Sequence, residues 1–126
     1  MKIPCLNKRL QFTNVARFGK KFVSNAFIVQ AIETNESQDL GVGRFGFIVT
    51  KKNGNAVVRN LIKRRLKSIV QNNLKMKQVP VLDYVVIARV GCVDIKYHDL
   101  EKNFESAFAF FREKFPNMAT FHKKGN

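Results

Sequence analysis

Residues 50–70 read TKKNGNAVVRNLIKRRLKSIV, and this stretch decides how the rest of the chain is interpreted. Gly54 interrupts the chain, and Asn55 after it is a typical N-cap because its side chain can accept a hydrogen bond from the first helical turn. The pattern predicts a helix from Asn55 to about Leu74. The apolar residues recur with the helical period and would share one broad face: Val58, Leu61, Ile62, Leu66 and Ile69.

The polar side of this helix is a row of cations. Arg59, Lys63 and Lys67 follow one another at i, i+4 spacing with no acid between them. Each such like-charge pair costs an isolated helix roughly 0.2–0.5 kcal/mol, so the pattern indicates an external anion. Arg65 falls at the edge of the apolar face, where we expect its stem to pack and its head to reach solvent.

The charge of the whole chain agrees with a polyanionic partner. Its 126 residues are enough for one domain with its own core, and they carry 23 Lys and Arg against 9 Asp and Glu, a net charge of +14. No acid occurs from residue 40 to residue 82, whereas six of the nine lie between Asp83 and Glu113. A surface built for solubility alone would intersperse the two signs. Because of this charge, we expect sulfate or phosphate to stabilise the fold.

Other classes of site find little support in the sequence. Cys5 and Cys92 are far apart, and His98 and His122 do not complete a metal-ligand spacing with them, so we expect no metal site and reduced thiols, as in the cytoplasm. We see neither a signal peptide nor an apolar run long enough to cross a membrane. A role at a membrane surface is also disfavoured, because the basic stretch lies inside a domain.

The remaining pattern predicts one domain over residues 8–116, preceded by a loose leader at 1–7 and followed by a basic tail at 117–126. The last helix carries an aromatic stripe that we interpret as core: Leu100, Phe104, Ala107, Phe108, Phe111 and Phe115. The other predicted elements are a helix at 8–18, a strand at 22–34, a polar connection at 33–43, a strand at 44–50 antiparallel to the first, a strand at 83–90 and that last helix at 98–115.

The block at 50–70 resembles the signature region of the bacterial ribonuclease P protein subunit. The match consists of Lys-Lys-x-Gly-Asn-Ala-Val-x-Arg-Asn in the expected order of elements, and the resemblance covers about residues 8–115. It implies an α+β single-domain αβββαβα sandwich with a left-handed βαβ crossover, like the second domain of ribosomal protein S5. The implied function is to bind the catalytic RNA of ribonuclease P and the 5′ leader of precursor tRNA, assisting endonucleolytic removal of that leader.

The resemblance also implies which residues bind each ligand. It implies a protein monomer in a 1:1 complex with the RNA, no catalytic residue of its own, and no cofactor other than Mg²⁺ held through the RNA. The implied contacts to catalytic RNA are Lys52, Asn55, Arg59, Asn60, Lys63, Arg64 and Lys67. The implied leader-binding cleft contains Phe12, Val15, Ala16, Ile28 and Gln30, with Lys51 nearby.

This chain departs from the family pattern at four positions. Leu61 replaces the second arginine of the signature, which removes one guanidinium. Ala16 and Gln30 stand in the cleft where an aromatic residue is common, and stacking on an aromatic ring is worth about 1–3 kcal/mol per base. Lys96 takes the place of a Ser or Thr cap before the last helix.

Three other functions compete with this interpretation. A general RNA-binding module of the ribosomal or chaperone type would have the same composition, and only the Gly54–Asn60 spacing separates it from a ribonuclease P subunit. A protein that cleaves RNA itself would need paired carboxylates, a metal cluster or a histidine acid and base, which the basic block lacks. A DNA-binding role would need a recognition helix with a dimerising partner.

Overall fold

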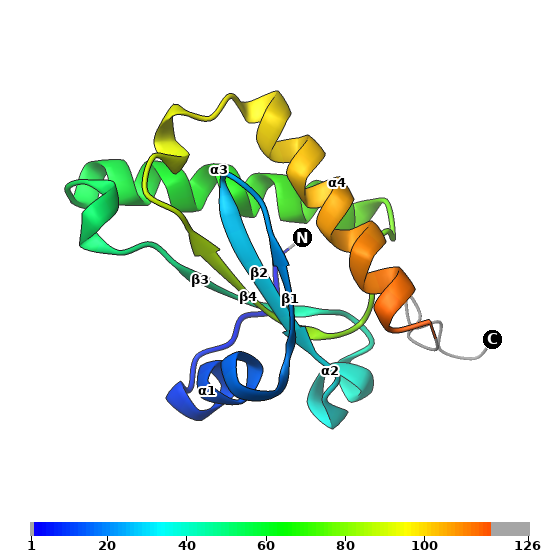
Figure 1. Ribbon diagram of the computed structural model, residues 1–126. Helices are drawn as coiled ribbons and strands as arrows, with labels where there is room; N and C mark the ends of the chain where they lie inside the picture. Colours follow the sequence, from blue (N-terminus) through cyan, green and yellow to red (C-terminus); the bar gives the residue numbers. More distant parts are fainter. Residues whose placement is uncertain (1, 117–126) are drawn as a thin grey trace.

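The computed structural model describes residues 2–116, so the tail predicted at 117–126 lies outside the described residues. Figure 1 shows a single α+β unit. In chain order its elements are α1 (Arg9–Phe18), β1 (Lys20–Val23), β2 (Phe27–Ile32), α2 (Asn35–Leu40), β3 (Arg44–Ile48), the 3-10 turn η1 (Lys51–Asn53), α3 (Ala56–Lys75), β4 (Asp83–Ala88), the 3-10 turn η2 (Cys92–Asp94) and α4 (Tyr97–Lys114).

The strands form one sheet in the order β1-β2-β4-β3. The single strand predicted at 22–34 is wrong, because the chain turns back at Ser24 and forms the antiparallel pair β1 and β2. The Ser24 hydroxyl accepts hydrogen bonds from the N–H groups of Ala26 and Phe27, which stabilises that turn. β3 does run opposite to β2, as predicted, but it pairs in parallel with β4 and not with β2.

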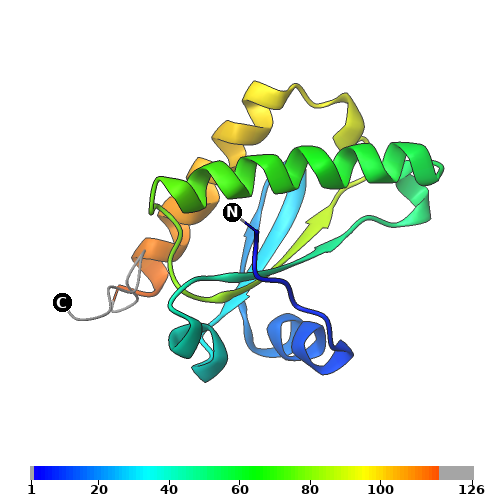
Figure 2. The same cartoon turned by 180° about the vertical axis from the view of Figure 1, so that it is seen from behind.

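The β3–α3–β4 segment is a crossover between neighbouring parallel strands. In Figure 2, α3 lies in front of the sheet and β3 and β4 run toward the upper right. When this view is turned so that the two strands point straight up, β4 lies to the left of β3, and the crossover is therefore left-handed. Most such connections are right-handed. The handedness implied by the family resemblance is therefore confirmed.

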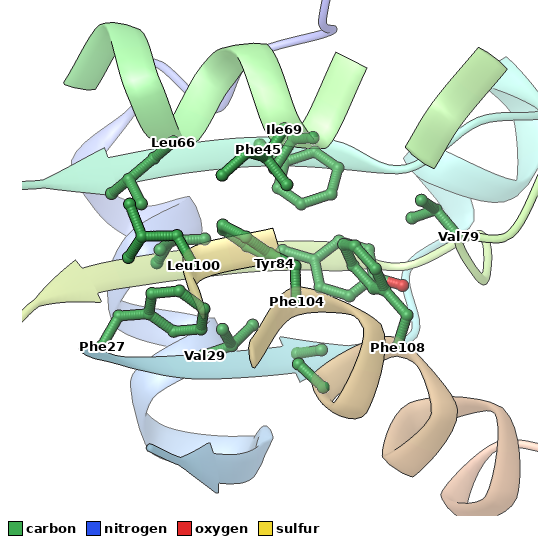
Figure 3. Packing of buried hydrophobic residues seen from close by; sticks show 14 of the residues in the cluster. Phe27, Val29, Phe45, Leu66, Ile69, Val79, Tyr84, Leu100, Phe104 and Phe108 are labelled. Carbon is green, nitrogen blue, oxygen red and sulfur yellow. The ribbon is translucent and has the colours of Figure 1, made fainter. Parts of the chain in front are cut away.

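The main core lies between the sheet and the two long helices α3 and α4. Figure 3 shows Phe27, Phe104 and Phe108 following one another between the sheet and α4, and of these Phe108 lies against Tyr84 of β4. Phe27 and Phe104 have ring centroids 4.3 Å apart, and Tyr84 stacks on Phe45 at 4.5 Å. The predicted aromatic stripe of α4 is core as expected, since all its members but the half-buried Phe115 are buried.

The opposite face of the sheet carries α1. Val15 of α1 packs with Leu6 and with Val85 of β4 in a second, smaller apolar cluster. Gly19 ends the helix where the chain passes close to the sheet, and a Cβ there would lie 2.4 Å from the carbonyl oxygen of Val15 and 2.8 Å from that of Ala31. A residue larger than glycine would therefore push α1 away from β2.

A loose leader was predicted at 1–7, but its described part, residues 2–7, is attached to the sheet. Phe45 donates its N–H to the carbonyl of Pro4 at 2.8 Å, and Leu6 donates its N–H to the carbonyl of Phe45 at 2.9 Å. Ile3 and Leu6 are buried. The segment is ordered because these apolar side chains and backbone groups cover part of the outer edge of β3.

The connection predicted at 33–43 contains a helix that was not expected. α2 begins after Thr34, whose hydroxyl accepts a hydrogen bond from the N–H of Ser37. It ends at Gly41, which adopts the left-handed conformation with φ 80°. Six mostly polar residues are too short and too polar for a periodic signal, so the helix depends on its caps.

Candidate nucleic-acid interface

The signature residues first build the start of α3. Asn55 caps the helix as predicted, because its side-chain oxygen accepts a hydrogen bond from the N–H of Val58 at 3.0 Å. Gly54 has a φ of 134°, a conformation that favours glycine. Arg59 donates to the carbonyl of Gly54 at 3.2 Å, so part of its donor capacity is used within the protein. Gly54, Asn55 and Arg59 therefore fix the direction in which α3 leaves the sheet.

Beyond this turn, α3 presents its cations to solvent. Arg64 and Lys67 are exposed, and Lys63 and Arg59 are half-buried. Within residues 2–116, Arg44 forms an ion pair with Asp83 and His98 lies 3.8 Å from a carboxylate oxygen of Glu101, and neither contact involves α3. The positive charge of the helix is therefore not neutralised by the described part of the chain. The exposed residues of the predicted RNA-binding set are Lys52, Asn55, Asn60, Arg64 and Lys67.

Two residues of α3 differ from expectation. The head of Arg65 does not reach freely into solvent, because it donates to the carbonyls of Val93 at 3.1 Å and Ile95 at 2.7 Å. Arg65 thus ties α3 to η2 and is a structural cation. Leu61, predicted to lie on the apolar face, is 38 % exposed. The position where the family has a second arginine is therefore at the surface.

The predicted leader-binding residues lie on the other face of the sheet, with α1. The ring of Phe12 is half-buried and lies over Gly46 of β3, so that a Cβ on Gly46 would be 2.3 Å from Cε2 of Phe12. Ile28 and Gln30 of β2 are half-buried on this face, and Ala16 is exposed. Val15 is only 1 % exposed, so the prediction that it contacts the leader is wrong: it anchors α1 to the sheet.

The strand register adds residues to the sheet face that carries the predicted leader-binding set, and these were not predicted from the sequence. Strand pairing sets Val23, Ile28, Ile87 and Ile48 side by side across all four strands. Val23 is 54 % exposed, and the other three are half-buried. The next row along the strands begins with Lys21, which pairs with Gln30. The alternation of these residues along each strand was visible in the sequence, but the missed turn at Ser24 hid the contribution of β1.

The two predicted surfaces therefore lie on opposite sides of the sheet. In Figures 1 and 2, α3 and α1 are separated by the strands, and the N-terminal segment runs past the β3 edge between them. The exposed Lys51 and Lys52 follow β3 in η1, at the connection between the two sides. The seven predicted contacts to catalytic RNA belong to η1, the cap and α3, and the predicted leader-binding residues other than Lys51 belong to α1 and the sheet.

The titratable side chains of residues 2–116 do not gather into a metal site. This part of the chain brings no three His, Cys, Asp or Glu side chains together around a possible metal ion. Burial raises the pKa of Tyr84 and of Cys92, and the hydrogen bond to Asp83 raises the pKa of Arg44. Each of these groups stays in its ordinary protonation state at neutral pH, so none is poised to exchange a proton.

No helix within the described residues is both long enough and apolar enough to span a membrane.

The fold and the charged surface define a small basic α+β protein of the kind that serves as an RNA-binding subunit. The family model described as Ribonuclease P matches residues 2–112. The chain is 38% identical over 98 residues to the ribonuclease P protein component of Streptococcus pneumoniae serotype 4, which covers 78% of this chain and 76% of that protein.

Two solved structures show the same fold. The RNase P protein of Staphylococcus aureus superposes with a TM-score of 0.74 at 24% identity, covering 88% of this chain and 97% of that one. The RNase P protein from Thermotoga maritima gives a TM-score of 0.70 at 22% identity, covering 86% of this chain and 96% of that one. The chain belongs to the Ribonuclease P family, that of the bacterial protein subunit that takes part in tRNA processing as a component of an endoribonuclease complex.

Proposed function

We propose that this protein holds the catalytic RNA of ribonuclease P with α3 and guides the 5′ leader of precursor tRNA through the cleft between α1 and the sheet. The observation that carries the proposal is the acid-free surface of α3, on which Arg64 and Lys67 are exposed and unpaired with any described acid. Removal of the leader is then carried out by the RNA, with Mg²⁺ held by the RNA and no catalytic residue from the protein.

The helix suits a folded RNA because it is rigid and its cations are spaced along it. Neutralising phosphates releases condensed counterions, which gives affinity and a steep dependence on salt without reading any base. A folded RNA is recognised largely through its shape and its backbone. Asn60, one position from Arg59, adds an exposed carboxamide that can bond to a phosphate or a ribose hydroxyl.

The cleft suits a single strand because it combines an aliphatic floor with one aromatic ring and one cation. Bases can lie against Ile28 and Ile87, Phe12 offers a ring on which any base can stack, and the exposed Lys21 can meet a phosphate. Ala16 and Gln30 provide no ring, so we expect less stacking than in relatives with an aromatic residue there.

The proposed assembly is one protein and one RNA in the cytoplasm. Cys5 and Cys92 are free thiols, which agrees with a reducing compartment. Precursor tRNA is the proposed substrate of the assembly, and the protein contributes affinity and not chemistry.

The test is cleavage of precursor tRNA by a bacterial ribonuclease P RNA at low Mg²⁺, with and without the protein. We expect the protein to restore cleavage and Arg64→Met combined with Lys67→Met to remove the effect. Lys75→Met is the matched control, since Lys75 is an exposed cation of the same helix outside the predicted set. Arg59 is a less clean choice because it also bonds to the carbonyl of Gly54.

A second arm tests the cleft. Phe12→Ala should weaken binding of leader-bearing precursor and leave binding of leaderless tRNA unchanged. Equal weakening of both would show that Phe12 does not serve the leader. If tight, salt-sensitive RNA binding came without any rescue of cleavage, the chain would be acting as a general RNA-binding module.

A further inference from the structure

The outer edge of β3 is only partly covered. Along this strand, Arg44 donates its N–H to Leu82 beside β4, so the backbone groups of the alternate residues Phe45 and Phe47 point away from the sheet. The N-terminal segment takes both backbone groups of Phe45. Within residues 2–116, the outward N–H and carbonyl of Phe47 have no protein partner.

A small pocket lies at this open edge. Its volume is about 190 Å³, and it is lined by Phe47 of β3, by Lys63 and Lys67 of α3, by Phe12 of α1 and by Cys5 of the N-terminal segment. The ammonium of Lys67 lies 5.9 Å from the centroid of the Phe47 ring. The pocket therefore combines two cations from the proposed catalytic-RNA surface, the aromatic ring of the proposed leader cleft and the unpaired backbone groups of Phe47.

The shape of the edge decides what fits there. A peptide that extends a sheet needs several consecutive residues with free backbone groups. Here both backbone groups of Phe45 are already bonded to the N-terminal segment, and β3 ends at Ile48. Phe47 is therefore the one residue of β3 whose outward backbone groups remain available. A phosphate needs much less, because one N–H and two ammonium groups already provide charge-assisted hydrogen bonds. A pocket of about 190 Å³ has room for several water molecules, which a phosphate can displace.

We propose that this pocket binds one backbone phosphate of RNA at the place where the two proposed RNA surfaces meet. Lys63 and Lys67 supply the charge, and the N–H of Phe47 supplies a directed donor. The ring of Phe12 borders the same pocket and can contact the sugar or base that adjoins the phosphate. The inference rests on the proposed function, and the phosphate can come from the catalytic RNA or from the leader.

Cys5 offers a direct reporter. It is exposed and lines the pocket, whereas Cys92 is buried, so iodoacetamide should label Cys5 selectively in the folded protein. Inorganic phosphate at fixed ionic strength should slow this labelling, with chloride as the reference. Lys67→Met should weaken the protection about tenfold, the loss expected for one charge-assisted contact. Lys75→Met, which leaves the pocket intact, should keep it.

Equal labelling rates with and without phosphate, or equal protection in Lys67→Met and wild type, would overturn the proposal. In the RNA arms, protection by catalytic RNA alone assigns the phosphate to that RNA, and protection only after adding leader-bearing precursor assigns it to the leader. If the protein stimulates cleavage of precursor tRNA but Cys5 is protected by neither phosphate nor RNA, the phosphate pocket is refuted and the proposed function is unaffected. If the protein also fails to stimulate cleavage, both the phosphate pocket and the proposed function are refuted.

Discussion

The contact between Gly46 and Phe12 makes a quantitative prediction about the face that carries α1. A Cβ on Gly46 would lie 2.3 Å from Cε2 and 2.5 Å from Cζ of Phe12. Carbon atoms in contact lie about 3.5–4.0 Å apart, so Gly46→Ala must displace the ring by about 1 Å or more. Gly46 does not have a positive φ, so the backbone itself would accept alanine. Any cost of the substitution therefore reports the position of the ring.

The size of the effect follows from the half-buried state of Phe12. Overpacking of this kind costs about 1–3 kcal/mol. Truncating a fully buried phenylalanine costs about 3–5 kcal/mol, so Phe12→Ala should cost about 2 kcal/mol. Once the ring is gone, Gly46→Ala should be neutral or stabilise the protein by about 0.4–1 kcal/mol, because alanine restricts the unfolded chain. The two substitutions should therefore couple by about 1–3 kcal/mol.

Urea unfolding of the wild type, the two single variants and the double variant measures this coupling. We expect Gly46→Ala to destabilise the wild type and to be harmless beside Phe12→Ala. If Gly46→Ala costs the same in both backgrounds, the ring does not lie over Gly46. The assignment of Phe12 to the cleft and to the phosphate pocket would then lose its structural basis.

Three further predictions concern the charge and the core. For RNA binding, Arg64→Met should reduce the slope of the logarithm of the binding constant against the logarithm of the salt concentration by about 0.7–0.9, and Lys75→Met should change it less. Equal changes in the two variants would mean that net charge alone governs binding. Arg65→Met should leave that slope unchanged but destabilise the fold by about 1.5–3 kcal/mol in urea, since two carbonyls near η2 lose their donor; a changed slope would show that Arg65 also binds RNA. Tyr84→Phe removes the hydrogen bond to the carbonyl of Pro80 and should cost about 1–2 kcal/mol at neutral pH. Because burial raises the pKa of Tyr84 well above 10.0, the folded protein keeps the phenol proton at a pH where the unfolded chain loses it. The stability of the wild type should therefore fall above pH 10, and that of Tyr84→Phe should fall less. Parallel curves of stability against pH for the two proteins would refute this.

The parts of the fold that the sequence predicted well are those with a local signal. α3 and α4 carry apolar residues at helical spacing over many turns, and Asn55 caps α3 as its residue type suggests. Periodicity over 18 to 20 residues is hard to produce in any other structure, because it defines a continuous face that must be buried.

The parts that were missed depend on contacts between distant segments. Nothing local in β3 shows that it pairs with β4, since pairing is set by the crossover through α3. The order in the N-terminal segment comes from the edge of β3 some 40 residues later, where Pro4 and Leu6 meet Phe45. The turn at Ser24 was hidden because apolar residues continue on both sides of it.

For the site, residue type and motif predicted the charged surface better than the cleft. A cation on an exposed helix face is available whatever lies beneath it, so the predicted residues of α3 remain candidates. The contribution of a cleft residue depends on which way it points. Val15 was predicted to contact the leader and is buried, while Val23 and Ile87 were not predicted and lie beside Ile28 on the sheet face that carries α1. Such assignments require the register of the sheet.

The crossover brings the two proposed RNA surfaces close together in a short chain. β3 leads directly through η1 into α3, so residues 44–75 pass from the sheet onto the face that carries α3 without a single acid. Most acids lie in the half of the chain that returns through β4 and α4. The attraction for an RNA is therefore stronger around the β3 edge and α3 than on the α4 side, where acids and bases nearly balance. This asymmetry of charge favours an orientation in which the β3 edge and α3 face the proposed RNA partner.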